Sequence, residues 1–303
     1  MRAFTLTVTA ASLLAALPSP AFAWGDEGHK VIAAIADHFL TPAVRQKVHA
    51  MLEADPDSLT AHDIASAAAW ADKYRDSDRK ATKQRYNATH LWHFVDIETS
   101  GAKAGDVFSA CFHEPKIPAG TPVSQGPARD CIYNKIGAFA AELTDPKVPS
   151  AEKTVALKFL LHLVGDVHQP LHTADNHNSG GNAVRVNARG SRVGTFHHYW
   201  DVELVERTDP GAARGDFHRL SETLIKGISN MEVSAWSRGT AKDWALESYA
   251  IVKGDPIMAL PKGEFQRTHE LPDAYVEAAT KQTREQLQKA GVRLAAVLNE
   301  ALR

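Results

Sequence analysis

The chain has 303 residues, of which 44% are hydrophobic and 23% are charged. Its 34 Lys and Arg residues are balanced by 36 Asp and Glu residues, giving a formal charge of −2. Because a protein that holds nucleic acid by phosphate neutralisation alone should be basic, this charge excludes that class of binding protein. An anionic ligand would need a local positive charge, and bound metal ions are one source of it.

Residues 1–23 have the pattern of a secretory signal peptide. Arg2 supplies a positive charge, an apolar run extends from Thr7 to Leu17, and Ala21-Phe22-Ala23 is a small-residue cleavage site. The run is too short to span a bilayer, which takes about 20 residues. We therefore expect a secreted or periplasmic protein, processed after Ala23, in which residues 24–303 form one domain without a membrane span.

The first half of this domain has mostly helical spacing. Apolar residues recur every three or four positions over 26–39, and Thr41-Pro42 is a typical helix start. A third helix is expected over the Ala-rich stretch 61–75. Residues 99–130 are rich in Gly, Pro and Ser and should form a long loop.

The chain has two cysteines, Cys111 and Cys131. In an oxidising compartment they are expected to form one disulfide. Because two cysteines are too few for a zinc–thiolate site, a metal would need His and carboxylate ligands.

The second half is also predicted to be mainly helical. Ser150 should cap a strongly apolar helix that ends at Pro170. Residues 184–193 alternate in polarity around Asn-Ala-Arg-Gly, which predicts a small β-hairpin. The remaining helices are expected over 196–207, 216–230 and from 240 to the C-terminus. The predicted fold class is all-α: a single mainly helical domain with one small hairpin.

Several of the 15 histidines have the spacing of metal ligands. His162 and Asp166 are four residues apart on the apolar helix, and His197 and Asp201 repeat this spacing, so each pair shares one helix face. Helices commonly present two zinc ligands in this way. One pair alone is more typical of a satisfied hydrogen bond, but two pairs together favour a metal site.

Other residues would complete such a site. Asp72 and His93 stand beside tryptophans, and His172 lies just beyond the apolar helix. Cleavage before Trp24 would add a donor pair, since a free α-amine and the Trp24 carbonyl oxygen form a five-membered chelate, with His29 as a further ligand. The alternative is that Trp24 only covers the core.

Taken together, these segments resemble a known family. WGxxGH, WADxxR, WHFVD, HLVGDVHQPLH, GGN and HxxxD follow one another from Trp24 to Asp201. They are similar to motifs of the secreted three-zinc single-strand nucleases and 3′-nucleotidases, which include the fungal S-one and P-one enzymes. The resemblance implies the phospholipase C/P-one nuclease fold.

The resemblance also implies three Zn²⁺ ions per chain. The implied ligands are Asp72, His93 and His162 for the first, the Trp24 amine and carbonyl with His29 for the second, and His172, His197 and Asp201 for the third. Asp166 would bridge the first two ions.

The implied activity is hydrolysis of single-stranded DNA and RNA to 5′-phosphorylated products, with 3′-nucleotidase activity, through a hydroxide that bridges two metals. Asp72 would orient the attacking water or take its proton, and Arg75 would neutralise the scissile phosphate. Phe94 would stack on the base, Asp96 would read it and Asn182 would line the pocket. A stacked base must be unpaired, which favours single strands. The sequence indicates no obligate protein partner.

Two alternatives remain open. A zinc phospholipase C would share the fold and metals, but such enzymes tend to carry Glu at the position of Asp201 and lack the HFVD segment. A non-catalytic extracytoplasmic zinc-binding protein would gain nothing from Arg75. Thr195-Phe196 and DNHNSGGN depart from the family pattern, which leaves the substrate contacts open. The neighbouring histidines are expected to have structural or packing roles: His90, His168 and His198.

Overall fold

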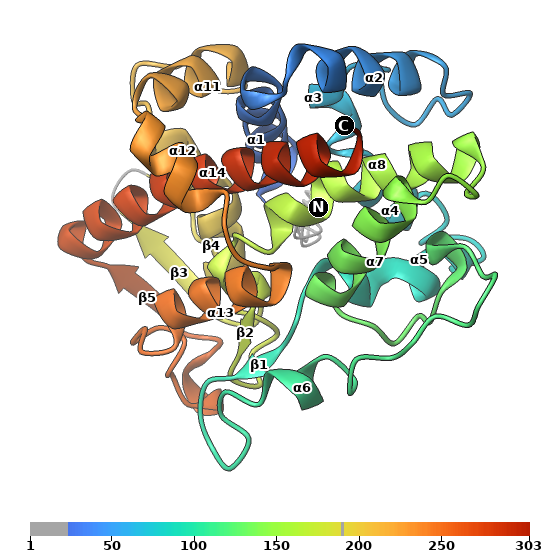
Figure 1. Cartoon of the computed structure of the whole chain (residues 1–303). Coiled ribbons are helices and arrows are strands. Elements are labelled where there is room, and N and C mark those ends of the chain that lie inside the picture. Colours follow the sequence, from blue (N-terminus) through green and yellow to red (C-terminus); the bar gives the residue numbers. More distant parts are fainter. Residues whose placement is uncertain (1–23, 189–190) are drawn as a thin grey trace, which may run out of the picture.

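The computed structural model describes residues 24–188 and 191–303, and it is mainly helical (Figure 1). The predicted signal peptide, residues 1–23, lies outside the described residues, as do residues 189–190 in the predicted hairpin. Figure 1 shows that helices form most of the molecule, with the short strands on the side opposite α2 and α3.

The described α-helices, in chain order, are α1 (Gly25–Phe39), α2 (Pro42–Glu53), α3 (Ile64–Ala67), α4 (Trp70–Asp76), α5 (Gln84–Thr89), α6 (Val107–Ala110), α7 (Ile132–Thr144), α8 (Ser150–Asp166), α9 (Phe196–His198), α10 (Leu204–Arg207), α11 (Phe217–Lys226), α12 (Asn230–Trp236), α13 (Ala241–Val252) and α14 (Asp273–Ala301). Short 3₁₀ segments add η1 (His90–His93), η2 (Val123–Gln125), η3 (Pro170–His172) and η5 (Lys262–Glu264), and a π-helical segment, η4 (Tyr199–Glu203), lies between α9 and α10. The strands are β1 (Ile97–Glu98), β2 (Ala174–Asp175), β3 (Arg185–Ala188), β4 (Gly194–Thr195) and β5 (Thr268–Leu271).

The strongly apolar helix α8 lies at the centre of the core. It packs against α7, α14, α1 and α4, and its residues from Ala156 to Asp166 are all buried. A helix that is apolar on every side requires burial on every side. The two polar residues near its end, His162 and Asp166, are therefore removed from water and need partners within the protein.

Helix α1 approaches α8 very closely where α8 carries Gly165. A Cβ atom at this position would lie 2.9 Å from His29 Nδ1 and 3.2 Å from Ile32 Cδ1. The missing side chain thus allows His29 on α1 to come alongside the polar end of α8.

The strands form two small sheets. β1 pairs in parallel with β2, with Ile97 opposite Ala174. The other sheet has the order β4-β3-β5. Its antiparallel β3–β4 pair, with Val186 opposite Gly194, confirms the predicted hairpin, while β5 adds a parallel strand from a segment expected to be helical.

Several predicted helices are shorter than expected. The Ala-rich helix is divided into α3 and α4, and the C-terminal one is interrupted between Val252 and Asp273, where Pro256, Pro261 and Pro272 lack the N–H that a helix needs. Ser150 is already inside α8, with Pro149 at the cap position and no side-chain cap. Helix α7 was missed, although Ile132, Ile136, Phe139 and Leu143 recur along it with helical spacing.

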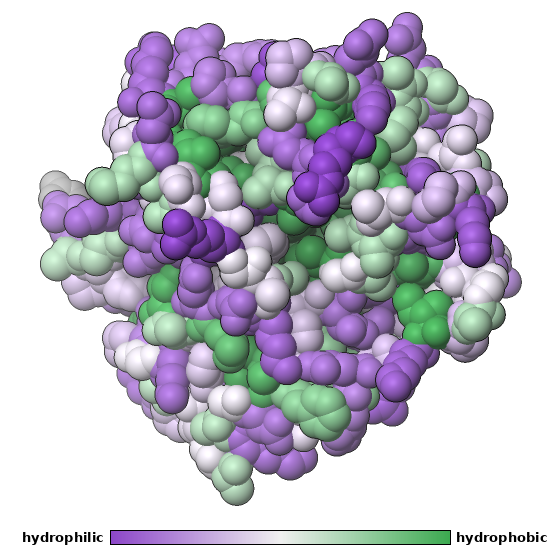
Figure 2. Space-filling view, viewed as in Figure 1, coloured by the Kyte–Doolittle hydropathy of each residue, from purple (hydrophilic) through white to green (hydrophobic). Residues whose placement is uncertain are grey.

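The surface is mixed in polarity. Figure 2 shows hydrophilic and hydrophobic residues interspersed over the face in view. Among the described residues, no helix has both the length and the apolarity needed to cross a membrane.

The predicted disulfide between Cys111 and Cys131 is confirmed. Both cysteines are buried. The next residue, Ile132, donates its backbone N–H to the Phe94 carbonyl oxygen at 3.2 Å. The disulfide therefore fixes the segment that holds Phe94 in place.

The double variant Cys111→Ala, Cys131→Ala should have a free energy of unfolding about 3 kcal/mol lower than the unaltered protein. The reason is that the disulfide closes a loop of 20 residues and thereby restricts the unfolded chain. Urea unfolding of the two proteins measures the difference. Adding a reducing agent to the unaltered protein should reproduce the shift and should leave the double variant unchanged. An unaltered unfolding midpoint in the double variant would contradict the expectation.

Candidate metal centre and pocket

A first cluster joins α8 to α4 and η1. His162 Nε2 and His93 Nδ1 lie 3.1 and 3.0 Å from Asp166 Oδ2. Each of these ring nitrogens is also 3.5 Å from Asp72 Oδ1. All four side chains are almost fully buried. The structure therefore brings together four of the predicted ligands in a space that excludes water.

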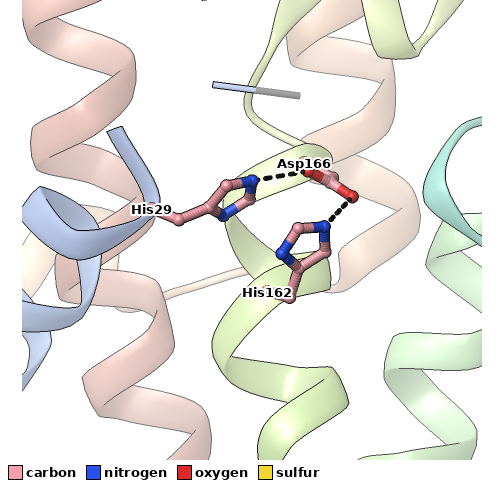
Figure 3. Close-up of side chains that lie close together, drawn as sticks. All are labelled: His29, His162 and Asp166. Atoms are coloured by element: carbon pink, nitrogen blue, oxygen red, sulfur yellow. Dashed lines mark ion pairs between the residues drawn. The ribbon is translucent and has the colours of Figure 1, made fainter. Parts of the chain in front are cut away.

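A second cluster uses the other oxygen of Asp166. His29 Nε2 on α1 lies 3.2 Å from Asp166 Oδ1, and the His29 and His162 rings stack with centroids 3.9 Å apart. Figure 3 shows the Asp166 carboxylate beside both rings, with an ion pair to each of them. Its two oxygens face different histidines, which is the arrangement of a carboxylate that can bridge two cations.

Trp24 lies beside both Asp166 and Asp201. Its indole N–H donates to the Gly165 carbonyl oxygen at 2.8 Å, and its backbone N–H donates to Asp201 Oδ1 at 3.3 Å. Its carbonyl oxygen accepts the first hydrogen bond of α1, from Gly28 at 2.9 Å. The Trp24 backbone is thus buried next to the clusters.

A third cluster contains His172 of η3, His197 of α9 and Asp201 of η4. The two Nε2 atoms are 3.1 Å apart, and His197 Nε2 is 3.4 Å from Asp201 Oδ2. Here the helix changes to the wider π form over Tyr199–Glu203, a local feature often found at functional sites.

Backbone carbonyls fix the ring orientation of three histidines. His162, His172 and His197 each direct Nδ1 to a carbonyl oxygen at 2.7 Å, those of Ala68, His93 and Gly180. An Nδ1–H that donates to such an oxygen leaves Nε2 as an unprotonated lone pair, as in histidines that bind metals.

In the third cluster, the Nε2 atoms of His172 and His197 face one another and need a positive charge between them. Two lone pairs 3.1 Å apart repel one another unless a proton or a cation lies between them. Burial disfavours the proton, because it lowers the pKa of His172 and, together with the His172 charge, lowers that of His197 to about 3. The donor set therefore fits a metal ion.

The spacing of the donor atoms supports the same conclusion. Tetrahedral zinc with bonds of about 2.0–2.1 Å places its ligand atoms roughly 3.3 Å from one another. The separations given above, between 3.0 and 3.5 Å, bracket that value. Moreover, six buried atoms of the cluster residues have no hydrogen-bond partner: His29 Nδ1 and Nε2, Asp72 Oδ1, His93 Nε2, Asp166 Oδ1 and Asp201 Oδ2. Leaving them unsatisfied is costly, and a cation would satisfy those that face a cluster.

The carboxylates differ in protonation. Burial alone would raise the pKa of Asp72 and Asp166, but Arg75 next to Asp72 and His162 next to Asp166 outweigh it and lower both pKa values. Those two carboxylates in turn raise the pKa of His162 to about 10 despite its burial. For Asp201 burial prevails, and its pKa rises. Metal binding would release protons from His162 and Asp201.

A pocket of about 690 Å³ opens onto these clusters. The predicted site residues that line it are Arg75, His93, Phe94, Asp96, His172, Asn182 and His197. Arg75 contacts Asp72 through Nη1, and its other guanidinium nitrogens donate to Asp76 at 3.1 and 2.8 Å. The other predicted site residues do not line the pocket: Trp24, His29, Asp72, His162, Asp166 and Asp201.

Sequence reasoning missed several residues of this site. Arg79, Tyr86 and Asp175 line the pocket, and the spacing of Arg79 four residues after Arg75 could have indicated the first of them. His90 also lines the pocket, although it was expected to be structural. His168, in contrast, is buried and bonds to Arg293 at 2.9 Å, outside the clusters.

Comparison with known proteins agrees with the family resemblance of the sequence motifs. The S1/P1 nuclease family model matches residues 24–303. The chain is 27% identical to Nuclease P1 of Penicillium citrinum over 290 residues, covering 91% of this chain and 97% of the relative. It is 27% identical to Nuclease S1 of Aspergillus oryzae over 307 residues, 97% and 96% of the two chains. Endonuclease 2 of Arabidopsis thaliana is 27% identical over 287 residues, 91% and 89% of the two chains.

Replacing Gly180 by Ala should destabilise the third cluster. Gly180 has φ +56°, and a Cβ atom there would lie 2.6 Å from the Leu171 carbonyl oxygen, so the segment that orients His197 must move. We expect a loss of about 1–3 kcal/mol in unfolding free energy and one fewer metal ion per chain. Thermal unfolding and elemental analysis provide the two measurements.

The matched control is Gly254→Ala, because a Cβ atom at Gly254 meets nothing within 4 Å. Gly180→Ala protein that melts like this control and binds as much metal would show that the backbone at Gly180 does not position His197.

Proposed function

The chain belongs to the S1/P1 nuclease family, and from this premise we propose that it is a zinc-dependent hydrolase of phosphodiester bonds. Its substrates are single-stranded DNA and RNA, which it cleaves to 5′-phosphorylated products, and 3′-nucleotides. Residues 24–303 constitute one catalytic domain, and residues 1–23 direct export and are removed. The Cys111–Cys131 disulfide is consistent with an oxidising, extracytoplasmic location.

The observation that carries the proposal is the set of buried histidine ring nitrogens that lie 3.0–3.5 Å from carboxylate oxygens in the clusters. Asp72, His93 and His162 would hold the first ion, and His29 with the Trp24 amine and carbonyl would hold the second, with Asp166 as a ligand to both. His172, His197 and Asp201 would hold the third. When bound, such ions polarise the phosphoryl group and lower the pKa of a coordinated water to about 7.

The chain's own residues then position and deprotonate the reactants. Asp72 is ionised and buried at the first cluster, so it would orient the attacking water or take its proton. Arg75, held by Asp72 and Asp76, presents a positive charge to the scissile phosphate from the pocket wall. Charge that develops on phosphate oxygens is thereby stabilised in a site with little water.

The remaining pocket residues select the base. Phe94 is half-buried and lines the pocket directly after the ligand His93, so its ring offers a stacking surface for a base next to the metals. Asp96 would accept hydrogen bonds from the base, and Asn182 lines the same pocket. A base stacked on Phe94 has left its duplex, which makes the single strand the preferred substrate.

Replacing His162 by Ala should abolish activity and lower stability together. The ring touches both the Asp72 and the Asp166 side of the centre, so its loss should reduce hydrolysis of single-stranded DNA more than about a hundredfold. Chelator treatment of the unaltered protein should lower its Tm by about 10 °C, the effect of a ligand present at about a thousand times its Kd. Calorimetry, elemental analysis and a single-strand nuclease assay measure these changes.

The control is the exposed Met231→Ala variant, which should retain zinc and activity. Metal-loaded protein that hydrolyses phosphatidylcholine instead would indicate a phospholipase C, and metal-loaded protein that hydrolyses neither substrate would indicate a zinc-binding protein. A Tm unaffected by chelator would contradict the metal centre itself.

An extra Met before Trp24 should remove one zinc ion per chain and reduce activity at least about tenfold, because it converts the donor amine into an amide. Metal content by elemental analysis is the primary measurement. The same residue added after Arg303 is the control, and full metal content in the N-terminally extended protein would exclude the Trp24 amine as a ligand.

A further inference from the structure

A row of three side chains forms one wall of the pocket and takes no part in the function proposed above. Arg79 follows α4, Tyr86 belongs to α5, and His90 is the first residue of η1; all three line the pocket. The Arg79 guanidinium carbon lies 4.9 Å from the centroid of the Tyr86 ring. The Tyr86 and His90 rings stack with centroids 4.9 Å apart and an interplanar angle of 9°.

Each end of this row is connected to a residue of the metal clusters. Asp76 accepts two hydrogen bonds from Arg75 and lies 3.7 Å from Arg79 Nη1, so it links Arg79 to the arginine at the clusters. At the other end, His90 and the ligand His93 are the first and last residues of η1. Side chains three residues apart in a 3₁₀-helix lie above one another. The row therefore extends the site along the wall.

Contacts within the protein hold the two rings of the row in place, and the positive charge of Arg79 remains accessible to a ligand. His90 Nδ1 hydrogen-bonds to the Tyr86 carbonyl oxygen at 2.9 Å, which fixes its ring against Tyr86. The Arg79 side chain is 43% exposed, and its ion pair with Asp76 is long because Asp76 is already bound by Arg75. A fixed aromatic pair beside an exposed guanidinium loses little freedom when a ligand binds.

We propose that Arg79, Tyr86 and His90 bind a second nucleotide of the substrate strand, adjacent to the nucleotide held at Phe94. Its base stacks on the Tyr86–His90 pair, and its phosphate pairs with the Arg79 guanidinium. Aromatic rings combined with cationic groups are the usual means of holding a single strand. The inference rests on the proposed function and specifies it, since it makes a strand a better substrate than a mononucleotide.

The pocket lining supports this assignment. Phe94, Tyr86 and His90 line one pocket together with the ligand His93. A strand bound in this pocket can therefore place one base against Phe94 and another against the Tyr86–His90 pair.

The experiment compares kcat/KM for a single-stranded tetranucleotide and for a 3′-mononucleotide, using the zinc-loaded protein. Arg79→Ala and Tyr86→Leu should each lower the value for the tetranucleotide about tenfold, mainly through KM, and the value for the mononucleotide less than about threefold. Arg79→Ala should also reduce the slope of log(kcat/KM) against log salt concentration by about 0.7, the contribution of one phosphate contact. Arg267→Ala, an equally charged change at a 74% exposed residue outside the pocket, is the control.

Equal losses for both substrates, or no loss, would overturn the second subsite. Arg79 is exposed, so its variant remains informative even if Tyr86→Leu unfolds. If the unaltered protein hydrolyses neither substrate, the result contradicts the proposed function but does not test the second subsite. Binding of a labelled oligonucleotide then tests the subsite, and an affinity for Arg79→Ala equal to that of the unaltered protein would refute it.

Discussion

The structure depends on burying charged and polar groups at the end of its most apolar helix. His162 and Asp166 occur where α8 is surrounded on all sides, and Asp72, His93 and His29 face them from other elements. Each of these groups alone would destabilise a core. As a set they form donor clusters that a cation can satisfy, and the same contacts hold α1, α4 and η1 against α8. The metal centre is therefore also the packing centre, so folding and metal binding are expected to be coupled.

Local sequence patterns could predict pieces of this centre but not its assembly. The spacing of His162 and Asp166, four residues apart on one helix, correctly indicates a shared face. Nothing local indicates that His29, 137 positions before Asp166, would approach its other oxygen. That approach depends on Gly165, whose missing side chain admits the His29 ring. Likewise, the carbonyls that set the ring orientations belong to Ala68, His93 and Gly180, which take these positions only after folding.

The errors in the predicted fold have a related origin. Residues 61–75 are rich in alanine, the strongest helix former, so propensity favours one helix, yet the chain is interrupted between Ala67 and Trp70. The Ala68 carbonyl oxygen in this interruption accepts the hydrogen bond from His162. Tertiary packing around α8 overrides propensity here. In contrast, the break between Val252 and Asp273 could have been predicted from Pro256, Pro261 and Pro272, and helix α7 from its apolar spacing.

The distribution of charge explains how an almost neutral chain can act on a polyanion. The buried part of the site is acidic, with Asp72 and Asp166 ionised, so alone it would repel phosphate. Cations held there reverse that sign over a short range, because the surroundings contain little water to screen them. The pocket wall adds Arg75 and Arg79, whose shared partner Asp76 restrains the two guanidinium groups relative to one another. Attraction to phosphate would thus be concentrated at this pocket, which both arginines line.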